Sequence, residues 1–226
     1  MKKLIAIIVV LIVILIGMIG YKNIKIKENN NNTNIQEIEQ IEKYLTKIYM
    51  WKEVTKEALP TFEDINEADE MWLWSVIEKN IEDYEISYEQ VQNKAKELFG
   101  NNFTKEFPKE GTENLTYNKE TQKYYASGII LDQLEDSFLL NEINKMQDVF
   151  EVEIIEYLED YSQISQSGEK IIIKNLEDEV IGEVRESEGE TKIQEIVRNN
   201  KDRFSKKKVY LKHSKEDELI IQKVVK

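Results

Sequence analysis

The sequence predicts an α+β domain that one N-terminal helix holds to a membrane. Three observations point to this class: an apolar run near the N-terminus, apolar residues at helical spacing up to residue 100, and strand-like segments joined by short turns after residue 115. Helices that come first and hairpins that follow are typical of helices packed on an antiparallel sheet. We therefore expect about three helices on one face of a curved sheet of hairpins.

The apolar run covers residues 4–21, LIAIIVVLIVILIGMIGY. At a rise of about 1.5 Å per residue, its eighteen residues span about 27 Å, close to the roughly 30 Å hydrocarbon core of a bilayer. A cleavable signal peptide is the alternative, but cleavage after either glycine of the run places Leu15 or Met18 where a small residue is needed. We expect an uncleaved transmembrane anchor over residues 1–21.

Lysines flank the run on both sides, so the charge bias hardly favours either orientation. A short N-terminal tail before a long domain is typical of a tail that stays in the cytoplasm. We expect a single-pass protein of the cell membrane, with its N-terminus in the cytoplasm and its C-terminal domain outside. Residues 22–34 are polar and rich in asparagine and predict a flexible tether, which leaves residues 35–226 for the extramembrane domain.

The composition is acidic, with 31 Lys plus Arg against 44 Asp plus Glu and a net charge of −13. Such a surface repels phosphate groups, so we do not expect a nucleic acid partner. The expected partners are the membrane, through the integral span, and a protein or cell-envelope component. The chain contains no cysteine, which excludes disulfides and attachment through a lipidated cysteine.

Residues 35–100 form the expected helical part. Apolar residues spaced by three and four from Ile35 predict a first helix that ends near Glu57. A coiled-coil partner helix is the alternative for this stripe, but barely three heptads favour packing on the chain's own domain. Thr61 followed by Asp64 resembles a capping box and predicts a second helix that runs to about Asn80.

The third expected helix has the clearest boundaries. Ser87 and Gln90 form a capping box at its start, and Gly100 stands where a C-cap glycine belongs. The connection that follows, residues 101–113, contains proline and glycine and leads out of the helical part.

Residues 115–226 form the mainly strand part. Connections of two to six residues between apolar segments require antiparallel neighbours. We also expect a short helix over residues 192–200, with Thr191 and Gln194 as its cap. The expected strand pairs are 115–117 with 124–130, 137–145 with 149–161, 170–174 with 180–184, and 208–212 with 219–225.

This layout resembles cone-shaped NTF2-like or cystatin-like domains, in which helices cover a curved antiparallel sheet. The resemblance is one of architecture, carried by no motif of the sequence. It implies a fold and no activity, because function does not follow from fold.

Motifs for chemistry are sparse. The only histidine, His213, stands among charged residues after an expected strand, and one histidine without cysteine excludes the usual zinc sites. Residues 167–170 and 205–208 both read S-x-x-K, but the S-D-N and K-T-G companions of that motif are missing. We therefore expect no catalytic, cofactor-binding or metal-binding residue and no cofactor.

Acidic and aromatic residues provide the remaining candidates. The acidic row Glu151, Glu153 and Glu156 motivates one enzymatic hypothesis, because a hydrolase of this kind needs paired carboxylates in a concavity. Trp72 and Trp74 point about 200° apart on a helix, so at least one should leave the apolar face, although a second buried layer is the alternative. The candidate binding-surface residues are Trp72, Trp74, Tyr124 and Tyr125.

These observations favour a non-enzymatic interaction or envelope-assembly module, tethered outside the cytoplasm. Two alternatives stay open: a carboxylate-based envelope hydrolase, and a bitopic subunit of a larger membrane complex.

Overall fold

The computed structural model describes residues 34–112, 114–126, 134–162, 170–214 and 218–226. The expected anchor over residues 1–21, and the expected tether apart from its last residue, lie outside these ranges. Among the described residues, no helix is both long enough and apolar enough to cross a membrane. The described part is α+β with antiparallel sheets, as predicted for the domain that follows the apolar run.

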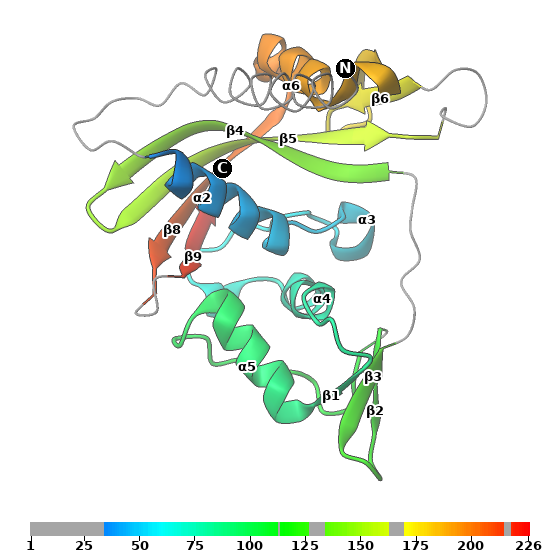
Figure 1. Ribbon diagram of the computed structural model, residues 1–226, viewed down its shortest axis with the longest axis vertical. Coiled ribbons are helices and arrows are strands. Elements are labelled where there is room, and N and C mark those ends of the chain that lie inside the picture. Colours follow the sequence, from blue (N-terminus) through cyan, green and yellow to red (C-terminus); the bar gives the residue numbers. More distant parts are fainter. Residues whose placement is uncertain (1–33, 113, 127–133, 163–169, 215–217) are drawn as a thin grey trace, which may run out of the picture.

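The larger sheet has six antiparallel strands in the order β7-β6-β5-β8-β9, with β4 also paired to β5 (Figure 1). The three expected hairpins of this region are confirmed, and the β4–β5 turn closes with Met146 paired to Val149. The strands are β4 (Leu134–Met146), β5 (Val149–Asp160), β6 (Lys170–Lys174), β7 (Val180–Arg185), β8 (Ser205–His213) and β9 (Leu219–Val225).

A second sheet corrects the expectation of a single one. The hairpin of β2 (Leu115–Asn118) and β3 (Lys123–Ala126) pairs with β1 (Glu85–Ser87), in the order β1-β3-β2. It lies beyond the helices, far from the six-stranded sheet (Figure 1). Because β1 is three residues long, its alternation is too short to be recognised in the sequence.

Helix α2 (Ile35–Ile48) is shorter than expected, and a separate turn, α3 (Lys52–Thr55), follows it. The prediction that this helix reaches Glu57 is wrong because another helix, α4 (Glu70–Lys79), supplies side-chain donors to the last carbonyls of α2. These bonds run from Trp72 Nε1 to Ile48 O (3.1 Å), from Lys79 Nζ to Thr46 O (3.0 Å) and Tyr49 O (2.7 Å), and from Asn80 Nδ2 to Lys47 O (2.9 Å).

The predicted start of the second helix is also wrong. Asp69 caps α4, while Asp64 caps only a single 3₁₀ turn, η1 (Ile65–Glu67). The preceding segment cannot be helical because it pairs with the edge of β9, where Phe62 and Val224 exchange two backbone hydrogen bonds of 3.0 and 2.9 Å.

Helix α5 (Tyr88–Phe99) confirms the capping box of Ser87 and Gln90. Gly100 ends it with a φ of +89°, and a Cβ there would lie 2.7 Å from the Ile220 side chain, so this turn requires glycine. Helix α6 (Gly189–Asn199) begins before its expected cap. Thr191 therefore lies within the first turn and does not cap the helix.

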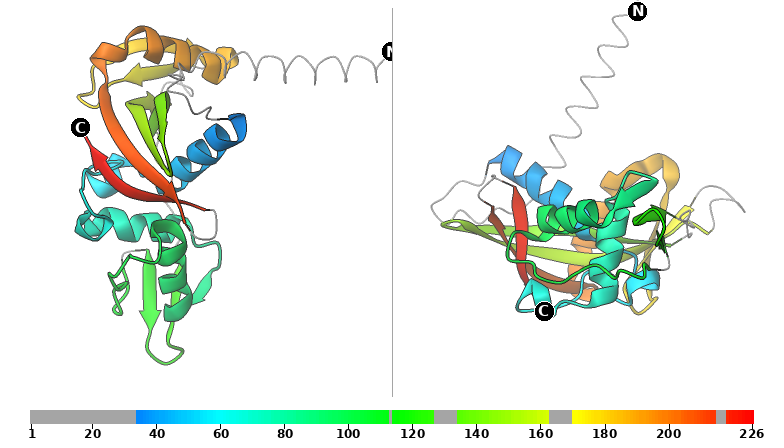
Figure 2. Two further views of the ribbon diagram at one scale, coloured as in Figure 1. Left: turned by 90° about the vertical axis from the view of Figure 1, so that its left-hand side faces the viewer. Right: turned by 90° about the horizontal axis from the view of Figure 1, so that it is seen from below.

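Helices cover both faces of the larger sheet, which corrects the expectation of one covered face (Figures 1 and 2). Helices α2, α4 and α5 share a core with Val152 and Ile154 of β5, whereas α6 packs over Ile155 and Tyr157 of the same strand. Successive side chains of a strand point to opposite faces. The C-terminal half of β5 is thus buried on both sides.

Candidate functional site

The most unusual polar residue of the domain is Glu156, whose exposed fraction is 0%. It lies on β5 opposite Phe138 of β4 and Ser205 of β8. Because side chains alternate along a strand, Glu156 shares the face of Ile154, which is covered by α2 and α4, while Glu151 and Glu153 lie on the other face. The acidic row of the hydrolase hypothesis is therefore divided between two faces of the sheet.

A buried lysine holds one oxygen of this carboxyl group. Lys207 Nζ, on β8, lies 3.2 Å from Glu156 Oε1. The same nitrogen donates to Glu57 Oε2 at 3.2 Å and to the Leu59 carbonyl oxygen. These three acceptors use all three donors of the ammonium group. Lys207 therefore joins β5 and β8 to the segment that follows α3.

A tyrosine shares the same oxygen. Tyr49, the C-cap of α2, donates from its hydroxyl to Glu156 Oε1 at 3.2 Å. Burial, and then the negative charges of Glu156 and Asp136, raise the pKa of Tyr49 well above its ordinary value, so it stays a donor at neutral pH. Glu156 Oε2, by contrast, has no hydrogen-bond partner among the described residues. One oxygen of the carboxyl group thus serves two donors, and the other serves none.

Burial also raises the pKa of Glu156, and the attraction of Lys207 and the hydrogen bond from Tyr49 oppose this effect. An acidic residue with a raised pKa in a cleft is a candidate for a functional site. Structural ion-pair networks can raise a pKa in the same way, so the surrounding cavity must decide how the group is used.

Glu156 borders a cavity of about 370 Å³ between the end of α3, the start of β8 and the segment after β6. Its deepest charged residues are Glu156 and Lys207, and Lys52 and Asp136 lie half-buried at its side. The Lys52 backbone amide donates to Asp136 Oδ2 at 2.6 Å. The remaining lining residues, mostly at the mouth, are Lys56, Glu57, Ala58, Leu176, Glu177, Ser205 and Lys226.

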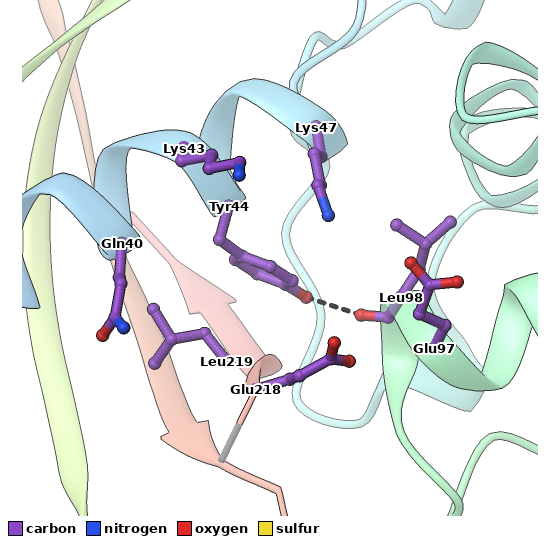
Figure 3. Close-up of a pocket in the computed structure, with 8 residues that line it drawn as sticks. All are labelled: Gln40, Lys43, Tyr44, Lys47, Glu97, Leu98, Glu218 and Leu219. Atoms are coloured by element: carbon purple, nitrogen blue, oxygen red, sulfur yellow. Dashed lines mark hydrogen bonds between the residues drawn. The ribbon is translucent and has the colours of Figure 1, made fainter. Parts of the chain in front are cut away.

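A second cavity, of about 190 Å³, lies between α2, α5 and the start of β9 (Figure 3). Its central residue, Tyr44, donates from its hydroxyl to the Leu98 carbonyl at 2.8 Å and accepts from the Ile221 amide at 2.9 Å. Both hydrogen-bonding roles of the hydroxyl are therefore filled within the protein. This cavity holds a structural link between three elements.

A third cavity, of about 280 Å³, contains His213. Its ring packs edge-on against Phe150, with 5.6 Å between ring centroids. The amide of Asn66, which also lines the cavity, donates to Asp64 and to the Asn102 carbonyl and accepts from Thr104. These contacts hold the loops in place and leave Asn66 little capacity for a ligand.

The predicted aromatic residues fall into two groups. Trp72 and Tyr124 are fully buried, so neither contributes to the surface. Trp74 is half-buried and packs edge-on against Phe103 and Phe107. Tyr125 is half-buried and contacts Tyr84, which is 71% exposed and which the sequence reasoning did not single out.

The residues around Glu156 were also missed, although one signal was present in the sequence. Lys207 alternates with Val209 and Leu211, both of which are buried, so its place in the strand predicts a side chain that points inward. In the described ranges, no group of three or more His, Asp or Glu side chains is arranged to hold a metal ion. No family model, no curated protein and no solved structure matches this chain.

Proposed function

We propose that the chain is a membrane-tethered, non-enzymatic binding module whose domain lies outside the cytoplasm. The observation that supports this proposal is the N-terminal cap of α2. Asn34 and Glu37 form a complete capping box at the start of this helix, with reciprocal hydrogen bonds of 2.9 Å. In the sequence, the polar residues 22–33 separate this cap from the apolar run.

The first turn of α2 is also fixed to the sheet, because Glu37 forms an ion pair with Lys145 of β4. Further along α2, Ile38, Ile41 and Leu45 lie in the core. A helix that is capped and packed from its first turn suits a domain that hangs from a linker, because the linker can move without unfolding the helix.

The binding part of the proposal is supported by the cavity at Glu156, where a buried carboxyl oxygen has no partner among the described residues. The acidic row of the hydrolase alternative does not supply a pair of carboxylates around one substrate, because Glu151 and Glu153 lie across the sheet from Glu156. The other carboxylates of the cavity already accept hydrogen bonds, Asp136 from the Lys52 amide and Glu57 from Lys207. A subunit of a larger membrane complex remains a special case of the same proposal, in which the partner would be another integral protein.

Fractionation and protease treatment of intact cells test the tether and its direction. We expect the chain in the membrane fraction, with its C-terminal domain digested when protease is added outside. The variant Val10→Arg with Val13→Arg should lose the membrane association, because charges at the centre of a span are costly. The matched variant Asn29→Arg with Asn32→Arg adds the same charges to the tether and should behave as the wild type.

Two results would contradict the proposal. A wild-type chain recovered in the soluble fraction with its first residues removed would mean a cleaved leader. A membrane-bound chain whose domain resists external protease, and is digested only after lysis, would place the domain in the cytoplasm.

A further inference from the structure

We propose that the cavity beside Glu156 binds a primary ammonium group, supplied either by a small amine or by a lysine side chain of a peptide. The inference deepens the binding part of the proposed function and rests on it. It does not depend on the anchor or on the side of the membrane that the domain faces.

The first argument is that one hydrogen-bond acceptor at the floor of the cavity, Glu156 Oε2, has no partner among the described residues. Glu156 Oε1 accepts from Lys207 and Tyr49, while Oε2 has no partner among the described residues. A buried polar atom without a partner costs about 1–3 kcal/mol, so a ligand that donates to it gains this amount on binding. A donor is required because an ionised carboxylate can only accept.

The second argument is that the buried donor is already occupied. The three donors of Lys207 go to Glu156, Glu57 and the Leu59 carbonyl oxygen, so Lys207 has none left for a ligand. Lys52 Nζ is directed to the Leu176 carbonyl at 3.0 Å. A ligand that needed donors from the protein would find few at the floor of this cavity.

The third argument is charge. At the floor and side of the cavity, the carboxylates of Glu156 and Asp136 stand with the ammonium groups of Lys207 and Lys52, and at the mouth Glu57 and Glu177 stand with Lys56 and Lys226. The side chains that line the cavity are therefore balanced in charge and do not repel a cation as a group. The preference for a donor comes from Glu156 Oε2, the buried acceptor without a partner among the described residues.

An ammonium group fits this floor better than a metal ion does. A calcium or magnesium ion takes six or more oxygen ligands, whereas one bound ammonium donates in three directions. Both carboxyl oxygens of Glu156 are covered in the present conformation, so the donor reaches Oε2 after a rotation about the terminal torsion of the side chain. This torsion is broad in glutamate and costs little to change.

Nuclear magnetic resonance of the full chain in detergent micelles tests the inference with two simple cations. Methylammonium chloride carries N–H donors, whereas tetramethylammonium chloride carries the same charge and none. We expect methylammonium to shift the amide signals of Asp136, Glu156 and Lys207 with a saturable constant of about 1–10 mM, and tetramethylammonium to bind at least about tenfold more weakly.

Two variants locate the site. Glu156→Gln keeps the shape and the Oε1 acceptor and should weaken methylammonium binding about tenfold or more. Glu153→Gln makes the same change of charge on the other face of β5 and should leave binding unchanged. A second measurement uses the wild type alone and does not depend on the folding of a variant. The titration of Glu156 is followed by the signal of its carboxyl carbon. Methylammonium should lower the pKa of this carboxyl group, and tetramethylammonium should not.

The source of the ammonium group is distinguished by comparing methylammonium with the blocked tripeptide Gly-Lys-Gly. Equal affinities would assign the cavity to small amines, and tighter binding of the peptide would assign it to a lysine of a partner. The inference is overturned by equal binding of the two simple cations, by unchanged binding in Glu156→Gln, or by a single ordered water on Oε2 with no saturable amine binding. Binding of acetate in place of either cation would overturn the ammonium class and leave the binding function standing.

Discussion

Two buried polar side chains, Tyr44 of α2 and Glu156 of β5, differ in how much of their hydrogen-bonding capacity is used within the protein. Tyr44 uses its hydroxyl once as a donor and once as an acceptor, both to backbone groups of neighbouring elements. Glu156 uses one oxygen twice and leaves the other without a partner among the described residues. The comparison teaches that the first cluster is complete as a structural link, whereas the second has capacity left for a ligand.

The largest expected effect is on the free energy of unfolding of Lys207→Met. The change leaves the buried carboxyl of Glu156 without its opposite charge, which costs about 3–5 kcal/mol. Lys208→Met is the matched control, because Lys208 pairs with Glu151 on the face of the sheet opposite Glu156, and its side chain is 44% exposed. That change should cost no more than about 1 kcal/mol in urea unfolding followed by tryptophan fluorescence. Equal losses for the two variants would contradict the assignment of a buried ion pair.

The next largest effect is expected for Tyr44, whose hydroxyl both donates and accepts within the protein. Tyr44→Phe leaves the Leu98 carbonyl and the Ile221 amide without their partner and should cost about 2 kcal/mol of unfolding free energy. Tyr210→Phe removes a hydroxyl that donates to Glu151 at 2.7 Å from a half-buried position, and we expect a loss below about 1 kcal/mol. If Tyr44→Phe were neutral, the hydroxyl would not link the three elements, and the contrast between the two clusters would disappear.

A smaller effect is the pH dependence of the Glu156 cluster. The pKa of Glu156 is raised in the folded state, so its contribution to stability is present below the ordinary value of 4.5 and is lost as the pH rises through the folded pKa. The groups that face Glu156 are Lys207 from β8, Tyr49 from the end of α2, Asp136 from β4 and Glu57 from the loop after α3.

The measurement compares the wild type with Glu156→Gln. The unfolding free energy of the wild type should fall relative to that of the variant as the pH rises above the ordinary pKa of 4.5 and through the raised pKa of the folded state. The same comparison for Glu151→Gln should have the opposite sign, because hydrogen bonds from Tyr210 and Lys208 lower the pKa of Glu151. If the pH-dependent difference in unfolding free energy had the same sign for both variants, burial would not be what sets the pKa of Glu156.

The smallest effect on stability is expected for Lys52→Met. Its ammonium group donates to the Leu176 carbonyl at the side of the cavity, and we expect a change within about 1 kcal/mol. The change removes a like charge near the proposed ammonium site, so the affinity for methylammonium should rise about two- to fivefold. An unchanged affinity would show that the charge of Lys52 does not affect a cation bound at Glu156.

Much of the fold could be predicted from the sequence, because most elements carry local signals. The capping box of Ser87 and Gln90, the glycine at residue 100 and the alternation of the hairpin strands all lie within the segments that they define. The early end of α2 could not be predicted, because its last carbonyls are satisfied by Trp72, Lys79 and Asn80, which follow far later in the chain.

The candidate site was predicted only in part, for a related reason. Glu156 was singled out with two acidic neighbours along the strand, but its actual partners, Tyr49 and Lys207, come from segments about 107 and 51 residues away in sequence. Strand register brings Lys207 of β8 to Glu156 of β5, and the packing of α2 on the sheet brings Tyr49 to the same carboxyl group. Both are properties of the folded domain. The prediction that Trp72 and Tyr124 lie on a binding surface is wrong for a simpler reason. Large aromatic side chains occur both in cores and at binding surfaces, and these two are buried in the core.

The hydrogen bonds that Trp72, Lys79 and Asn80 donate to the carbonyls at the end of α2 also have a mechanical consequence. A pull applied at residue 34 enters the domain through α2, whose first turn is bonded to β4 and whose last turn is bonded to α4. The force is therefore divided between β4 and α4. Several hydrogen bonds must break together before α2 can separate from the domain. Helix α2 is in this way held at both of its ends by other elements of the domain.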